Sequence, residues 1–209
     1  MSATAVLIPF KAGLRKSRLA SVLGPAQRER LSLLMLLDVL GAFRGAGAVG
    51  SCHVVSSDME ALALARREGA MTIEESRDAG VNAAVMAGTA ALGEGREYFV
   101  VPSDLPSLAP REIVAAFELR KRFGCVISPS RAFDGTNLLG FAGGRRPPLS
   151  YDSDSFWNHV GGAAASGLSL AVLCAPGFLG DVDSPDDLRA LSRSRRTSRA
   201  AAFAREAVA

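Results

Sequence analysis

The chain opens with AVLIPFKAGLRKSRL, residues 5–19. The first part is apolar throughout, which predicts a buried strand, and the second part is a loop with four cations in eight residues. Lys11, Lys16 and Arg18, together with nearby backbone N–H groups, can cradle phosphates. We therefore predict a nucleoside triphosphate site, with a solvated basic loop as the alternative. It is not a P-loop, because Arg15 stands where the glycine before the lysine would be.

The rest of the chain alternates short apolar runs with longer helical patterns. Further strands are predicted at residues 51–56, 70–73, 98–101, 125–127, 138–141 and 168–174. Helices are predicted at residues 26–43, 59–68, 81–92, 110–122 and 156–165, and one more begins at Pro185. This alternation predicts a single α/β domain with a mostly parallel sheet and helices on both faces. Ligands of such sheets bind beyond the carboxyl ends of the strands.

The composition suits one globular domain. Of 209 residues, 48% are apolar and 22% are charged, close to the average for globular proteins. The net charge of +3 is small, which argues against a protein that coats nucleic acid. No apolar run approaches the roughly 20 residues that span a bilayer, and the first residues lack a leader pattern. With three widely spaced cysteines that suit reduced thiols in the core, we expect a cytoplasmic protein with no nucleic-acid or membrane partner.

The C-terminal residues differ from the rest of the chain. Much of the positive charge lies in four arginines between residues 193 and 199, and no clear apolar face follows Ser192. We therefore predict a folded domain at residues 1–191 and a basic tail at residues 192–209 that frays.

Carboxylates follow two of the predicted strands. Asp104 comes after the strand at residues 98–101, and Asp181 and Asp183 form an Asp-x-Asp pair before the last predicted helix. Mg²⁺ prefers oxygen ligands and usually takes one or two carboxylates plus substrate phosphates. The three aspartates are therefore candidate ligands of Mg²⁺. The alternative is that Asp183 and Ser184 only cap the helix that follows.

Six short motifs carry a resemblance to a known family. They are Ile8-Pro9-Phe10-Lys11 with Lys16-Ser17-Arg18-Leu19, Glu29-Arg30, Gly80-Val81-Asn82-Ala83-Ala84, Asp104-Leu105-Pro106, Gly135-Thr136-Asn137-Leu138-Leu139, and Asp181-Val182-Asp183-Ser184-Pro185-Asp186-Asp187-Leu188. Up to about Leu191, the chain resembles the 2-phospho-L-lactate guanylyltransferase family of coenzyme F-420 biosynthesis. The resemblance implies a nucleotide-diphospho-sugar-transferase-like (GT-A) fold.

For the nucleotide, the resemblance implies a guanylyltransferase that uses GTP and Mg²⁺. Lys16, Arg18 and Asp104 would be catalytic, and Asp104 would share the metal with Asp181 and Asp183. The implied nucleotide-binding residues are Pro9, Lys11, Lys16, Ser17, Arg18 and Asn82, with Asn82 near the nucleoside. The residue types alone do not report which base is chosen.

For the acceptor, the resemblance implies that Thr136, Asp152 and Ser155 hold a phosphorylated three-carbon acid. Phospholactate, phosphoenolpyruvate and 3-phosphoglycerate stay open as that acid. The family reaction joins the phosphate of the acid to the α-phosphate of the nucleotide and releases pyrophosphate. Such an acceptor is already anionic at pH 7, so the reaction needs positioning, charge neutralisation and a metal.

The sequence offers no convincing nucleophile, which ranks nucleotidyl transfer above hydrolysis. His53 falls inside a strand pattern and suits a structural role. His159 falls on a helix face without a matched carboxylate or serine, so a nucleophilic triad is not supported.

The acceptor loop departs from the family pattern. Where the family usually has Gly-Pro-Gly-Ser, this chain has Asp152-Ser153-Asp154-Ser155. One carboxylate at about 5 Å from one phosphate charge costs roughly 3 kcal/mol at an effective dielectric of about 20, before screening. Three explanations stay open: Arg131, Arg145 or Arg146 offsets the aspartates, the aspartates point away, or the acceptor differs in charge or size, for example by a hydroxyl that donates to an aspartate.

Two other functions stay open as alternatives. One is another nucleotidyltransferase of the same fold, of the sugar-phosphate or molybdopterin type, or a glycosyltransferase; these often have a glycine-richer first loop. The other is a non-catalytic nucleotide-binding homologue whose altered acceptor loop has lost its substrate. A homodimer also stays open.

Overall fold

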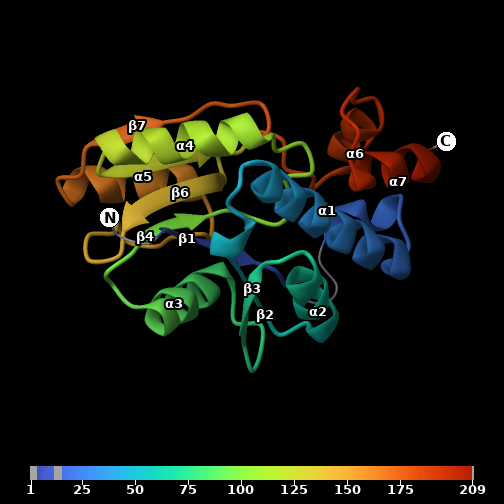
Figure 1. Cartoon of the computed structure of the whole chain (residues 1–209). Coiled ribbons are helices and arrows are strands. Elements are labelled where there is room, and N and C mark those ends of the chain that lie inside the picture. The colour runs from blue at the N-terminus through green and yellow to red at the C-terminus, as the bar shows by residue number, and fades with distance from the viewer. Residues whose placement is uncertain (1–3, 12–15, 209) are drawn as a thin grey trace.

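The computed structural model describes residues 4–11 and 16–208, in which strands and helices alternate (Figure 1). The strands are β1 (Thr4–Pro9), β2 (Cys52–Ser56), β3 (Met71–Glu74), β4 (Glu97–Val100), β5 (Cys125–Pro129), β6 (Thr136–Ala142) and β7 (Leu170–Val172). The helices are η1 (Ser17–Ser21), α1 (Pro25–Gly45), η2 (Val49–Ser51), α2 (Met59–Arg67), α3 (Val81–Leu92), α4 (Pro110–Arg122), α5 (Ser155–Ala165), α6 (Pro185–Ser192) and α7 (Arg199–Ala207). The predicted strands and helices are confirmed, with small shifts at their ends.

The strands of the described residues form one sheet in the order β3-β2-β1-β4-β6-β5-β7. β1 pairs in parallel with β2 and β4, and β5 pairs in parallel with β7. β6 runs antiparallel to both of its neighbours, β4 and β5. Because β6 is reversed, its first residue, Thr136, lies at the edge where the parallel strands have their carboxyl ends. The predicted mostly parallel sheet is confirmed, and its one reversal among the described strands contributes to the site.

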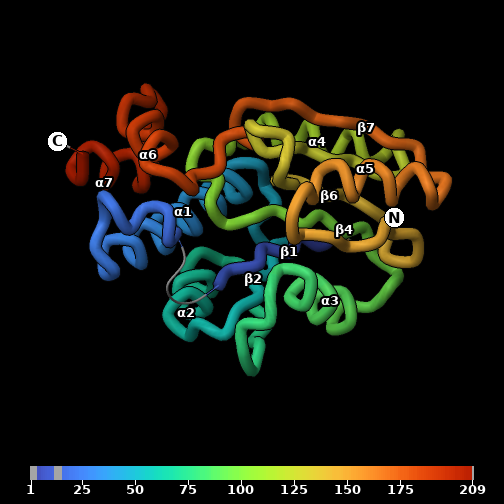
Figure 2. The backbone as a smooth tube through the Cα atoms, turned by 180° about the vertical axis from the view of Figure 1, so that it is seen from behind, coloured from blue at the N-terminus to red at the C-terminus, as the bar shows by residue number. Residues whose placement is uncertain are grey.

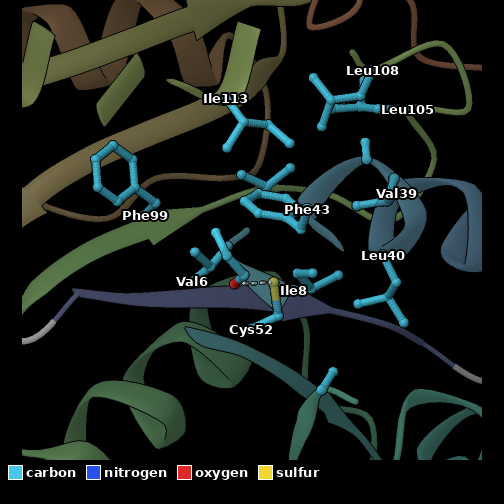
Figure 3. Close-up of a cluster of buried hydrophobic side chains, with 14 of the residues drawn as sticks. Val6, Ile8, Val39, Leu40, Phe43, Cys52, Phe99, Leu105, Leu108 and Ile113 are labelled. Carbon is cyan, nitrogen blue, oxygen red and sulfur yellow. Dashed lines mark hydrogen bonds between the residues drawn. The ribbon is translucent and has the colours of Figure 1, made fainter. Parts of the chain in front are cut away.

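Helices cover both faces of the sheet, as predicted. On one face α1, α2 and α4 pack against Val6 and Ile8 of β1, with Phe43 of α1 at the centre (Figure 3). On the other face α3 packs against β1 and β2, and α5 packs against β5, β6 and β7 (Figure 2). A Cβ on Gly88 of α3 would come within 2.7 Å of the Leu7 side chain, so the small residues of α3 allow it to lie close against β1.

The chain beyond Ser192 does not fray, contrary to the prediction. Residues Arg199–Ala207 form α7, whose buried residues pack with α1 and α6 in a third apolar cluster that includes Phe203 and Leu31. The carboxylate of Asp38 on α1 accepts hydrogen bonds of 2.9 Å from the first backbone N–H groups of α7. The buried face of α7 is mostly alanine. Alanines give a weak hydrophobic periodicity, so the sequence pattern did not predict this helix.

Smaller expectations are met in part. Cys52 and Cys125 are buried, as expected of core thiols, but Cys174 is exposed. His53 is structural as expected, since it is buried and its Nδ1 lies 3.0 Å from the carbonyl oxygen of Ser51. No helix in the described part of the chain is long and apolar enough to cross a membrane.

Candidate functional site

Loops from distant parts of the chain meet at the edge of the sheet where β1, β4 and β5 end. Two adjoining cavities lie there, a smaller cavity of about 450 Å³ and a larger cavity of about 710 Å³. Five residues line both of them: Pro9, Val81, Pro102, Asp104 and Asp183. The predicted ligand edge therefore carries a two-part site whose dividing wall includes two of the predicted metal ligands.

The smaller cavity collects most of the predicted triphosphate residues. Pro9, Lys11, Lys16 and Ser17 all line it. The ammonium of Lys11 is buried and lies 2.5 Å from Oδ1 of Asp78, the same oxygen that accepts the backbone N–H of Gly80 at 3.1 Å. The remainder of the cationic loop, including Arg15, lies outside the described residues.

Lys16 occupies the centre of the site. It holds a left-handed backbone conformation (φ 61°) at the start of η1, and its side chain is 9% exposed. Its ammonium lies 2.6 Å from Oδ2 of Asp104 and also contacts Oδ1 of Asp183. Burial lowers the pKa of Lys16, but these two carboxylates raise it more, so the pKa lies above its ordinary value. The ammonium therefore stays charged at neutral pH and holds the two aspartates together.

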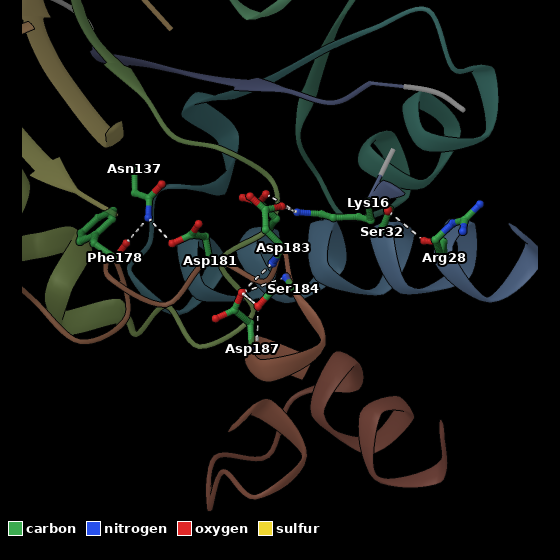
Figure 4. Close-up of polar contacts among 10 residues, drawn as sticks. Lys16, Arg28, Ser32, Asn137, Phe178, Asp181, Asp183, Ser184 and Asp187 are labelled. Atoms are coloured by element: carbon green, nitrogen blue, oxygen red, sulfur yellow. Dashed lines mark hydrogen bonds and ion pairs between the residues drawn. The ribbon is translucent and has the colours of Figure 1, made fainter. Parts of the chain in front are cut away.

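Ser184, and not Asp183, caps the helix α6. The Ser184 hydroxyl accepts the backbone N–H of Asp187 at 3.3 Å, and the Asp187 carboxylate accepts the N–H of Ser184 at 2.9 Å, which completes a capping box. This leaves the Asp183 carboxylate free to face Lys16 (Figure 4). Of the alternative that Asp183 and Ser184 only cap the helix, the part on Ser184 is confirmed and the part on Asp183 is wrong.

Asn137 positions the other aspartate of the Asp-x-Asp pair. Its amide nitrogen donates to the carbonyl oxygen of Phe178 at 2.7 Å and to Oδ1 of Asp181 at 2.9 Å (Figure 4). The pKa of Asp181 is raised to about 6: burial is the largest cause, the hydrogen bond from Asn137 opposes it, and the charges of Asp104 and Asp183 add to the rise. A carboxylate in such surroundings is stabilised by a nearby cation.

The three aspartates fit a divalent metal as far as their chemistry goes. Oδ1 of Asp104 is buried and has no hydrogen-bond partner among the described residues, which is costly for a carboxylate oxygen unless a cation or donor joins it. No cluster of three or more metal-ligating side chains is preassembled in the described parts of the chain. Mg²⁺ needs only one or two carboxylates when substrate phosphates complete its shell. The Mg²⁺ site at Asp104, Asp181 and Asp183 stays a prediction.

Arg18 points into the larger cavity, apart from Lys11 and Lys16. It lines that cavity together with Arg131 and Asp134. The hydrogen bond of 2.6 Å from Ser130 is the main cause that lowers the pKa of Asp134, and the charge of Arg18 adds a smaller effect. The three predicted phosphate-binding cations are thus divided between the two cavities.

The predicted acceptor residues come together in the larger cavity. Thr136, Asp152 and Ser155 all line it, with Asp154 beside them. The Ser155 hydroxyl donates to Oγ1 of Thr136 at 3.1 Å. Of the arginines considered as a counter-charge to the loop, only Arg131 lines this cavity. Arg145 and Arg146 follow β6, whose end lies at the opposite edge of the sheet.

Asn82 belongs to the acceptor loop as much as to the nucleotide side. Its Oδ1 accepts the backbone N–H of Tyr151 at 3.0 Å, and its Nδ2 donates to Oδ2 of Asp152 at 3.3 Å. The amide therefore ties the start of α3 to the loop before α5 and partly offsets one of the two unexpected aspartates. Its predicted contact with the nucleoside is not tested by this geometry.

The sequence interpretation missed two polar side chains that support the site. His159 does have partners, namely the Thr136 hydroxyl and the backbone N–H of Ser150, although neither is a carboxylate. The spacing of Ser155 and His159, four residues apart on one helix face, was a signal available in the sequence. Asn137 belongs to one of the family motifs, but nothing in its local sequence predicts its hydrogen bond to Asp181.

Comparison with known proteins agrees with this geometry. The profile of a family described as guanylyl transferase CofC-like matches residues 4–206. The chain belongs to this family. The family match includes α7 almost to its end, in agreement with the folded C-terminus.

Several named relatives cover most of the chain. A 3-phospho-D-glycerate guanylyltransferase of Phenylobacterium zucineum is 37% identical over 191 residues, which cover 88% of this chain and 88% of the relative. A phosphoenolpyruvate guanylyltransferase of Rubrobacter xylanophilus is 38% identical over 182 residues, covering 86% and 88%. A 2-phospho-L-lactate guanylyltransferase of Methanocaldococcus jannaschii is 31% identical over 174 residues, covering 83% and 75%. The chain is accordingly an enzyme of the nucleotidyltransferase class.

Solved structures with a similar fold confirm the fold prediction. A candidate nucleotide-diphospho-sugar transferase of Desulfovibrio desulfuricans matches with a TM-score of 0.78 at 21% identity, covering 99% of this chain and 95% of that chain. A nucleotidyl transferase from Methanothermobacter matches with a TM-score of 0.68 at 16% identity, covering 98% and 99%. At such low identity these likenesses concern the fold alone.

Proposed function

We propose that this CofC-like protein transfers GMP from GTP to the phosphate of a phosphorylated three-carbon acid and releases pyrophosphate. An oxygen of the acid's phosphate forms a bond to the α-phosphorus of GTP. The bond between that phosphorus and the oxygen that bridges to the β-phosphate breaks, and pyrophosphate leaves with the electron pair. The activities named for the relatives support both the guanylyl group and the class of acid.

The observation that carries this proposal is the pair of adjoining cavities that share Asp104 and Asp183. The triphosphate fits the smaller cavity, where Lys11 and Lys16 supply positive charge. The acid fits the larger cavity, where Thr136 supplies a hydroxyl. With the substrates bound in this way, the α-phosphate of GTP would lie near the shared wall, within reach of the acid, and proximity is the main requirement of such a transfer.

The charge of the larger cavity supports a dependence on Mg²⁺. Two arginines, Arg18 and Arg131, face seven aspartates there: Asp104, Asp134, Asp152, Asp154, Asp181, Asp183 and Asp187. Two anionic substrates meet at such a surface only when added positive charge offsets the carboxylates. Mg²⁺, when bound, would supply that charge to the phosphates. Asp104, Asp181 and Asp183 would hold it, and Lys16 would turn from the carboxylates to the triphosphate.

The product of this reaction would be a guanosine diphosphate ester of the acid. Its phosphoanhydride is an activated bond that suits transfer of the acid with its phosphate to a second acceptor. We place this step in coenzyme F-420 biosynthesis, as the family resemblance implies, and in the cytoplasm, as the composition of the chain predicts.

The test is pyrophosphate release by the purified protein. GTP, ATP and CTP are each combined with Mg²⁺ and with phospholactate, phosphoenolpyruvate or 3-phosphoglycerate, and parallel samples contain EDTA. We expect release with GTP and at least one of the acids, and none with EDTA. Measurable GTP binding without release for any acid would overturn the proposal in favour of a nucleotide-binding homologue. Release with CTP or ATP alone would overturn the choice of guanine.

A further inference from the structure

His159 is a buried histidine with both ring nitrogens engaged. It lies on α5, and its side chain is fully buried. Nε2 lies 3.0 Å from the backbone nitrogen of Ser150, and Nδ1 lies 2.9 Å from Oγ1 of Thr136. The ring of Tyr151 packs against it edge to face, with centroids 4.7 Å apart. The ring is therefore held at a fixed orientation next to the larger cavity.

The partners of His159 decide its tautomer. A backbone N–H can only donate, so Nε2 must accept the hydrogen bond from Ser150. A neutral imidazole carries one N–H, which must then be at Nδ1 and donates to the Thr136 hydroxyl. Burial lowers the pKa of His159 to about 4, so the neutral ring prevails around pH 7.

Thr136 receives a second donor. The Ser155 hydroxyl donates to the same Oγ1 at 3.1 Å. A hydroxyl oxygen accepts two hydrogen bonds and donates one, so both lone pairs of Thr136 are occupied and its own hydrogen must go elsewhere. With Ser155 as the donor of its pair and Nδ1 of His159 protonated, the contacts of this hydroxyl among the described residues include no acceptor for that hydrogen, and Thr136 lines the larger cavity.

We propose that His159 is a positioning residue that, together with Ser155, makes Thr136 a hydrogen-bond donor aimed into the larger cavity, where it binds an anionic oxygen of the acceptor acid. The inference rests on the proposed function. The occupied lone pairs turn a hydroxyl that ordinarily donates or accepts into one that only donates. It then favours a phosphate or carboxylate oxygen and disfavours a ligand hydrogen-bond donor.

A neutral donor suits this cavity for an electrostatic reason. A second buried cation would pair with the surrounding aspartates, as Lys16 pairs with Asp104. A hydroxyl held by a neutral imidazole carries no net charge, so it forms no such ion pair and stays available to the substrate. It also costs less to bury than a charged group.

The first test uses substitutions that separate the two hydrogen bonds of His159. In His159→Asn, the amide nitrogen takes the place of Nδ1 and still donates to Thr136, but the acceptor for Ser150 is lost. In His159→Gln, the amide oxygen reaches the place of Nε2 and accepts from Ser150, but the donor to Thr136 is lost. Both variants remove the ring, so they share the loss of packing against Tyr151.

We expect the variants to differ in KM for the acceptor acid but not in their affinity for GTP. At saturating GTP, His159→Gln and Thr136→Val should raise KM for the acceptor acid about ten- to a hundred-fold, the range for a hydrogen bond to a charged group. His159→Asn and Thr136→Ser should stay within about three-fold, and GTP affinity should change little in all four variants. If His159 had a purely structural role, the two His159 variants would show the same rise in acceptor KM. The acceptor KM of Thr136→Val would then be close to that of the unchanged protein.

The second test reads the tautomer directly and does not depend on turnover. In protein labelled with ¹⁵N at histidine, the His159 ring should show a protonated Nδ1 and an unprotonated Nε2 from pH 6 to pH 8. A ring protonated at Nε2, or an equal mixture, would overturn the proposal. If the protein turned over none of the acids, the proposed function would be wrong. The tautomer of His159 would still show whether Thr136 is held as a hydrogen-bond donor.

Discussion

The two cavities of the site present different groups to an anionic ligand. The smaller cavity presents the ammonium groups of Lys11 and Lys16, each already paired with a carboxylate of the protein. The larger cavity presents a hydroxyl, Thr136, held by the neutral side chains of Ser155 and His159. A buried ammonium must exchange partners when a phosphate arrives, whereas the hydroxyl needs no such exchange.

This difference predicts which protein groups should determine the binding affinity of each substrate. Binding of GTP should respond to single charges, because each lysine gives up one ionic partner for another. Binding of the acid should respond to the direction of hydrogen bonds and to the aspartates that line the loop before α5. The wall between the cavities, with Asp104 and Asp183, should affect both substrates and therefore the chemistry itself.

Breaking the shared wall should have the largest effect. We expect Asp183→Asn to reduce kcat by about a thousand-fold, because it removes the charge of a proposed metal ligand without removing an apolar contact. The protein should stay folded, since Ser184 caps α6 independently. Steady-state pyrophosphate release and thermal unfolding measure the two expectations.

The matched control for this prediction is Asp186→Asn. Asp186 lies on the next turn of the chain, is 88% exposed at its side chain and pairs only locally with Arg189. This variant should keep activity within about two-fold, because exposed pairs of this kind contribute little. An active Asp183→Asn variant would show that the carboxylate serves only to pair with Lys16.

Removing the ammonium at the centre should have the next largest effect. We expect Lys16→Met to weaken GTP binding about ten- to a hundred-fold and to leave acceptor KM at saturating GTP nearly unchanged. In the absence of nucleotide, Mn²⁺ should bind this variant more tightly than the unchanged protein, because the ammonium no longer competes for Asp104 and Asp183. Calorimetry gives the GTP affinity, and electron paramagnetic resonance gives bound Mn²⁺.

Lys121→Met is the control for charge alone. Lys121 is 68% exposed at its side chain and pairs with Glu118 within one turn of α4. It should bind GTP and Mn²⁺ as the unchanged protein does. If Lys16→Met behaved in the same way, the ion pairs of Lys16 would be purely structural.

Most of the fold, and the meeting of Pro9, Lys11, Lys16 and Ser17 at one cavity, could be predicted from the sequence. The apolar runs and helical patterns are local signals, so they predicted the strands and helices. Pro9, Lys11, Lys16 and Ser17 lie in one short segment that directly follows a strand, and the carboxyl-edge rule then fixed their place. Such predictions succeed because sequence neighbours remain neighbours in space.

What the sequence could not predict depends on contacts between distant segments. Arg18 lies close to Lys16 in the chain, yet η1 turns its side chain into the other cavity. The pairing of Asn82 with Asp152 spans 70 residues and has no local pattern. The C-terminal helix α7 was missed because its stability comes from packing on α1, which its own composition does not report.

The aspartates of the acceptor loop should give the smallest effect, and its sign decides their role. In the double variant Asp152→Asn with Asp154→Asn, we expect acceptor KM to fall about three- to ten-fold, because two negative charges leave a cavity that binds an anion. Asparagine suits both sites: it keeps the shape of Asp152 beside Asn82 and tolerates the left-handed backbone of Asp154 (φ 53°). The double variant Glu118→Gln with Asp186→Asn, which changes the net charge equally at side chains that line neither cavity, should leave KM unchanged. A rise of KM for 3-phosphoglycerate, but not for phosphoenolpyruvate, would contradict charge opposition and would mean that a carboxylate accepts the hydroxyl of the acid.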